Sequence, residues 1–129
     1  MSLMNKEQIM EIIPHRDPFL LIDTIEEMEP GQRVVTTKYM KEDEFWFKGH
    51  FPVVPGVLML EMLAQAGAVA MLALPENKGK IGLFGGVKDA KFRRQVVPGD
   101  LLKLEVEIIK VKGPIGVGKA LATVNGEKA

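Results

Sequence analysis

His50 and Glu61 stand on either side of a short loop rich in proline and glycine. Imidazole and carboxyl groups are the side chains most often used to move protons in catalysis. Between them, Pro55 and Gly56 favour the start of a helix, where the first backbone N–H groups have no partner within the helix. Gln65 follows Glu61 by one helical turn, so their side chains share a face of that helix. A proton donor, a proton acceptor and free N–H groups in one place predict an acid–base catalytic site.

The segment from Val57 to Leu74 is the element that must position these groups. Its only strongly polar residues are Glu61 and Gln65, and a helix that is apolar on nearly all sides is buried. A buried carboxylate is costly unless it is paired or takes part in chemistry. Taken singly, His50 could be an ordinary loop histidine, and Glu61 a structural group or an interface contact. Their meeting at the start of one buried helix favours the catalytic interpretation.

Composition excludes several other kinds of site. The 129 residues include no cysteine, which removes disulfides, thiolate zinc sites and cysteine nucleophiles. The only serine is Ser2, so a Ser–His–Asp site is not expected. Two histidines are too few for a histidine-rich metal cluster. His15 lies in a proline-bounded loop with no buried carboxylate near it in the sequence, so we predict a structural role for it. A formal net charge of zero gives no reason to expect a nucleic-acid partner.

The length predicts a single domain over 1–129 with its own core. Residues 1–3, which precede Met4, are expected to be an added leader and are left out of the predicted fold. No signal-peptide pattern is visible, and together with the lack of cysteine this favours a cytoplasmic location. The apolar segment is near the lower length limit of a membrane span, but Glu61 and Gln65 favour a buried core helix.

Polar and apolar residues alternate most clearly over 101–111, which predicts a half-buried strand. The same reasoning predicts a helix over 6–12, strands over 19–25, 33–40, 81–87 and 117–124, an extended segment over 88–97, and turns at 30–31, 75–79, 98–100 and 113–116. The order of these elements predicts an α+β fold in which an antiparallel sheet wraps around one long central apolar helix.

Residues 113–119 match the spacing of a phosphate-binding loop, G-x-x-x-x-G-K. Ala120 replaces the Ser or Thr that would hold magnesium, and the residues that follow favour a strand. Without a helix N-terminus the loop cannot cradle a phosphate, so we predict a glycine-rich hairpin.

A local basic cluster consists of Lys88, Lys91, Arg93 and Arg94, with Asp89 among them. Taken alone, it is best explained as a strand edge guarded by charge. Its functional interpretation is a docking surface for an acidic partner.

Four collinear blocks resemble the 3-hydroxyacyl-[acyl-carrier-protein] dehydratases of bacterial fatty-acid synthesis, the FabZ type. They are PHRDPFLLID at 14–23, GHFP at 49–52, PGVLMLEMLAQ at 55–65 and KFRRQVVPGD at 91–100. The resemblance implies a hot-dog fold, no cofactor, and a dimer that commonly assembles into a trimer of dimers. It matches His50 to the family histidine and Glu61 to the family glutamate, which the partner chain supplies to a shared site. It also makes an acidic acyl carrier protein the expected partner of the basic cluster.

The reaction implied is removal of water from a (3R)-3-hydroxyacyl thioester to give a trans-2-enoyl thioester. We expect His50 to take the C2 proton and Glu61, held protonated by its apolar surroundings, to donate to the departing hydroxyl. The N–H of Gly56 would stabilise the thioester oxygen. In a variant of this mechanism His50 handles both proton transfers and Glu61 only orients the hydroxyl. Gln65 could hold the Glu61 carboxyl or make a core hydrogen bond. Glutamate at position 61 favours the plain dehydratase over the related dehydratase-isomerase, which carries aspartate there.

The sequence departs from the family pattern in two places. The family has three more residues between its histidine and glutamate, and a further strand after the position of Ala129. Two competing functions stay open. One is a hot-dog thioesterase whose helix carboxylate activates water, which His50 argues against. The other is a non-catalytic module that binds acyl chains along the apolar helix, which the shortened loop keeps in consideration.

Overall fold

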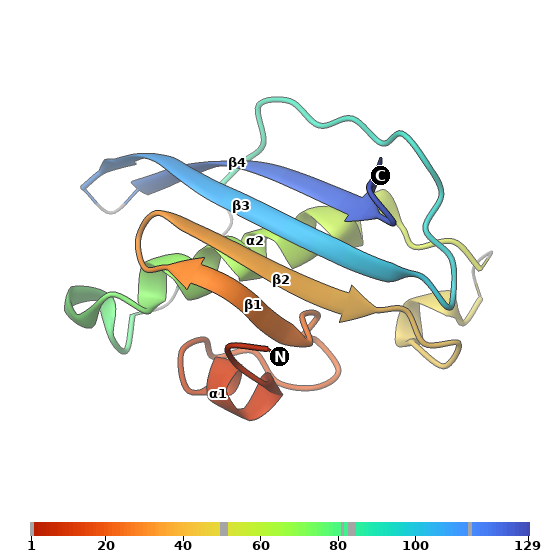
Figure 1. Ribbon diagram of the computed structural model, residues 1–129, viewed down its shortest axis with the longest axis horizontal. Coiled ribbons are helices and arrows are strands. Elements are labelled where there is room, and N and C mark those ends of the chain that lie inside the picture. Colours follow the sequence, from red (N-terminus) through yellow and green to blue (C-terminus); the bar gives the residue numbers. More distant parts are fainter. Residues whose placement is uncertain (1, 50–51, 81, 83–84, 114) are drawn as a thin grey trace.

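The computed structural model describes residues 2–49, 52–80, 82, 85–113 and 115–129. Its five strands form one antiparallel sheet in the order β1-β2-β3-β4-β5, and the long helix α2 lies across one face of it (Figure 1). The strands are β1 (Thr24–Glu29), β2 (Arg33–Tyr39), β3 (Leu101–Lys112), β4 (Ile115–Val124) and β5 (Glu127–Lys128). The helices are α1 (Lys6–Met10), α2 (Gly56–Leu72) and the 3-10 turns η1 (Phe45–Phe47) and η2 (Pro75–Asn77). The structure therefore has the predicted α+β architecture.

The core lies between α2 and the inner face of the sheet. On β3, Leu102, Leu104 and Val106 are buried while Leu101 and Lys103 are exposed, which is the alternation that the sequence predicts. The small residues of α2 let the helix approach the sheet closely, because a Cβ added to Gly67 would already touch the Val106 side chain at 3.4 Å. Within the described residues, no helix is long and apolar enough to cross a membrane.

The N-terminal segment packs against the first strand. Asn5 caps α1 by accepting from the Gln8 backbone N–H at 3.0 Å, and the Gln8 side chain accepts from the Asn5 N–H in return. The first residues, which were left out of the predicted fold, do take part in it. The Leu3 N–H donates to the Ile25 carbonyl at 2.7 Å, and Met4 forms a bridge with Ile25.

The strand predicted over 19–25 is wrong for most of its length, because β1 begins only at Thr24. The N–H groups of Phe19 and Leu20 donate to the Arg16 carbonyl, which makes a turn. The Leu21 N–H donates to the Gln65 side chain of α2 instead of to a neighbouring strand. This run is apolar because residues 20–22 are buried in the core, so burial, and not strand pairing, explains its composition.

The structure also differs from the prediction over 81–97. None of the described residues from Gly82 to Val97 lies in a strand, and Figure 1 shows this segment passing as a long loop above β4. The predicted residues 81, 83 and 84 lie outside the described part of the chain. Among the described residues, the outer edge of β4 pairs with β5 at Thr123 and Val124. The predicted hairpin, by contrast, is present, since β3 pairs directly with β4, but β4 begins at Ile115, within the turn predicted at 113–116.

Candidate active site

Glu61 and Gln65 lie on one face of α2, as their spacing predicts. The Gln65 Nε2 donates to the Glu61 Oε2 at 3.0 Å and to the Phe19 carbonyl at 2.9 Å, while its Oε1 accepts from the Leu21 N–H at 2.8 Å. Gln65 is 1% exposed, whereas the Glu61 side chain is 22% exposed. Gln65 therefore makes a core hydrogen bond and also holds the carboxyl, so the two roles proposed for it are not alternatives.

Gly56 is the first residue of α2, after Pro55. No side chain among the described residues caps this end of the helix, so the N–H groups of its first turn are not used in that way. The Phe92 ring lies directly over Gly56, because a Cβ added there would come within 2.8 Å of that ring. The position therefore needs glycine for close approach, and the helix start lies beside the block at 91–100.

His50, the predicted proton acceptor, lies outside the described residues, as does Phe51. The described residues on either side show how its loop is anchored. Gly49 has a φ of +72°, a conformation that glycine adopts readily. The Val54 N–H donates to the Val96 carbonyl at 2.8 Å, which fixes the end of the loop just before Pro55 and α2.

His15 was expected to be purely structural, yet the structure places it beside Glu61. Its Nε2 lies 3.7 Å from the Glu61 Oε2, the same oxygen that Gln65 binds. The carboxylate that the neighbouring sequence lacks is supplied by α2. Only the long-range contact between the loop at 14–22 and this helix brings the two together, and no local spacing signals that contact.

The four residues of the basic cluster are not equivalent. The Arg94 guanidinium lies 3.4 Å from carboxylate oxygens of both Asp100 and Glu127, so its charge is used in ion pairs within the chain. Lys88, Lys91 and Arg93 are exposed and form no ion pair with the residues that the structure describes. These three are the cations that a partner could reach.

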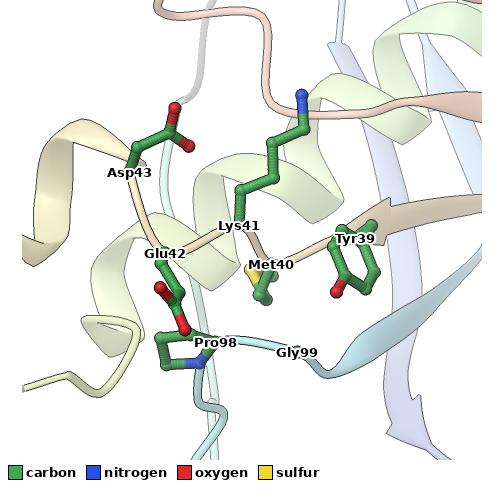
Figure 2. Close-up of a pocket in the computed structure, with 7 residues that line it drawn as sticks. All are labelled: Tyr39, Met40, Lys41, Glu42, Asp43, Pro98 and Gly99. Atoms are coloured by element: carbon green, nitrogen blue, oxygen red, sulfur yellow. The ribbon is translucent and has the colours of Figure 1, made fainter.

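An open cavity of about 440 Å³ lies between the loop after β2 and the turn before β3 (Figure 2). It is lined by Tyr39, Met40, Lys41, Glu42, Asp43, Pro98 and Gly99, and none of the predicted site residues is among them. A second cavity, of about 410 Å³, also lacks them. In the parts of the chain that the structure describes, no cluster of three or more His, Asp or Glu side chains could hold a metal ion.

The model of the FabA-like domain family matches residues 13–129. The chain belongs to the FabA-like family. Within this family it is similar to curated proteins named 3-hydroxyacyl-[acyl-carrier-protein] dehydratase FabZ. The Clostridium novyi protein is 62% identical over 126 residues, which cover 95% of this chain and 89% of that protein. The Staphylococcus aureus protein (strain Newman) is 58% identical over 131 residues, which cover 99% and 90% of the two chains.

A comparison of structures agrees with this family. The dehydratase heterocomplex ApeI:P from Xenorhabdus doucetiae matches with a TM-score of 0.74 over 93% of this chain and 83% of that chain, at 17% sequence identity. The match supports the fold, which is the predicted hot-dog fold of an antiparallel sheet around a central helix.

The alignment with the Staphylococcus aureus protein runs over 131 positions, whereas this FabA-like chain has 129 residues. That relative therefore has internal residues without a counterpart here. The shortened loop between His50 and Glu61 stays a prediction of the block spacing.

Proposed function

We propose that this protein is a 3-hydroxyacyl-[acyl-carrier-protein] dehydratase of fatty-acid biosynthesis. It would remove water from a (3R)-3-hydroxyacyl chain on acyl carrier protein and leave the trans-2-enoyl chain. The observation that carries the proposal is the 62% identity to a curated protein of that name over nearly the whole chain. The carboxyl of Glu61, oriented on α2 by Gln65, supplies one of the groups that such a reaction needs.

The geometry of Glu61 supports its role as the acid. The α-proton of a thioester is weakly acidic and hydroxide is a poor leaving group, so a base and an acid are both required. Gln65 donates to Oε2, and in the described part of the chain no hydrogen bond engages Oε1. A proton on Oε1 could then pass to the departing hydroxyl. His50, contributed by the second chain, takes the C2 proton in this mechanism.

The start of α2 is suited to stabilise the thioester oxygen. As the proton leaves C2, negative charge develops on that oxygen, and backbone N–H groups at a helix N-terminus stabilise such charge. Gly56 provides the first of these groups, and Phe92 packs against it as an apolar wall. Loss of a donor of this kind lowers turnover by about 10²–10³.

We propose a dimer with two shared sites, and a trimer of such dimers as the complete assembly. Apolar side chains near the site are exposed in the single chain, since Val57 is 71% and Phe92 55% exposed. A second apolar group lies at the far end of the β3–β4 hairpin, at Ile109, Val111 and Ile115. Exposed patches of apolar side chains are typical of surfaces that another chain covers.

Acyl carrier protein is the proposed macromolecular partner, and the cytoplasm the proposed location. Lys88, Lys91 and Arg93 form an exposed cationic surface on the same long loop as Phe92. An acidic carrier that docks there would present its acyl chain near the start of α2.

Hydration of crotonyl-CoA, the reverse reaction, tests the proposal through the loss of enoyl-thioester absorbance. We expect activity in the wild type and its collapse in both His50→Ala and Glu61→Gln. A folded wild type without hydratase activity would refute the proposal. Release of free thiol from acyl-CoA would identify a thioesterase instead.

A further inference from the structure

We infer that His15 is a positioning residue that fixes the Glu61 carboxyl for catalysis. This inference rests on the proposed dehydratase function and adds a third side chain to the acidic half of its site. His15 Nε2 and Gln65 Nε2 both face the Glu61 Oε2, at 3.7 and 3.0 Å. The first distance is a close contact, and hydrogen bonds of catalytic groups often shorten when substrate binds.

The loop that carries His15 is fastened to α2. Gln65 accepts from the Leu21 N–H and donates to the Phe19 carbonyl, so both chain segments share one buried amide. The Phe19 ring stacks on the imidazole, with ring centroids 6.3 Å apart and planes 16° apart. The Arg16 guanidinium donates to the carbonyls of Ile13 and His15, which holds the loop backbone. The imidazole is thus fixed relative to Glu61.

The placement of the two groups has a chemical consequence. Because both face Oε2, a donor on either one favours Oε2 as the accepting oxygen and leaves Oε1 to carry the acidic proton. His15 Nδ1 is buried and has no hydrogen-bond partner in the described part of the chain, whereas Nε2 is the ring nitrogen that faces the Glu61 carboxyl. A carboxyl held in one rotamer delivers its proton in one direction, which is how a supporting residue acts on turnover.

Two substitutions separate this role from simple packing. His15→Leu keeps a side chain of similar size but removes both ring nitrogens, and we expect kcat for crotonyl-CoA hydration to fall about 10- to 100-fold with KM nearly unchanged. His15→Gln keeps an N–H that can reach Oε2 and should retain most of the turnover. Asp17→Asn, at an exposed position of the same loop, is the matched control and should behave as wild type.

A double-mutant cycle tests whether His15 acts through Glu61. If it does, His15→Leu lowers kcat in the wild type but does not lower further the residual kcat of Glu61→Gln, measured at high enzyme concentration, since groups that act as a unit are not additive. Full turnover of folded His15→Leu would overturn the inference. So would an equal loss in His15→Leu and His15→Gln, or multiplication of the two effects in the cycle.

A measurement without turnover keeps this inference separate from the proposed function. In an untagged His50→Ala chain His15 is the only histidine, so its imidazole ¹⁵N resonances need no further assignment. We expect Glu61→Gln to shift the Nε2 resonance in that background. An unmoved resonance would overturn the contact whatever the activity. A shifted resonance, together with a folded wild type that has no hydratase activity, would defeat only the proposed function.

Discussion

Gln65→Leu is expected to weaken both the fold and the site, because one buried amide joins three parts of the molecule. The substitution leaves the buried Leu21 N–H without its acceptor and the Glu61 Oε2 without its donor. A buried donor without a partner costs about 1–3 kcal/mol. The Phe19 carbonyl also loses its donor, but Phe19 is exposed enough for water to replace it at small cost. We therefore expect the free energy of unfolding to fall by about 2 kcal/mol, or the Tm by roughly 5–10 °C.

Urea denaturation followed by circular dichroism measures this loss at fixed protein concentration, since association affects apparent stability. Gln95→Leu is the matched control, because Gln95 is exposed and should tolerate leucine within about 0.5 kcal/mol. Gln65→Glu should be worse than Gln65→Leu near neutral pH, because it places an acceptor against the Glu61 carboxyl and the Phe19 carbonyl. Equal stability of wild type and Gln65→Leu would refute the argument that this amide is structural.

Three further predictions follow from particular contacts. Gly56→Ala should lower stability by about 1–3 kcal/mol, because its Cβ would meet the Phe92 ring, and Phe92→Leu in the same chain should restore part of the loss in thermal unfolding. Lys38→Met should lower the free energy of unfolding, measured by urea denaturation, by about 3 kcal/mol, because Lys38 is buried and lies 2.8 Å from Glu44 and 3.5 Å from Asp23. An unchanged free energy of unfolding would show that these two ion pairs do not stabilise the fold. Lys91→Glu with Arg93→Glu should raise KM for acyl carrier protein substrates and reduce the salt dependence of turnover, while crotonyl-CoA hydration stays unchanged; unchanged kinetics on the carrier substrate would remove the docking surface.

Two elements could be predicted from the pattern of apolar and polar residues along the chain alone. The alternation at 101–111 predicts β3, and the long, mainly apolar run after Gly56 predicts α2 with Glu61 and Gln65 on one face. The capping box that Asn5 and Gln8 form at the start of α1 is likewise a local pattern of residue types.

The remaining features depend on contacts between segments far apart in the chain. The apolar run at 19–22 is held by the Gln65 side chain and not by a strand, and apolar content alone does not distinguish the two. The contact between His15 and Glu61 likewise arises only when the N-terminal loop packs on α2. The burial of Lys38 could have been predicted from the sequence, because Lys38 shares the inward side of β2 with Val34 and Thr36, both of which are buried.

The shared active site is tested most directly by mixing two inactive variants. His50→Ala and Glu61→Gln chains, each with only residual hydratase activity, are unfolded together and refolded, and native mass spectrometry measures the fraction of mixed dimers. One site in each mixed dimer then has an intact histidine from one chain and an intact glutamate from the other. Random association should restore about a quarter of the wild-type rate of crotonyl-CoA hydration. Mixed dimers that form but stay inactive would contradict a site built from His50 and the partner's glutamate.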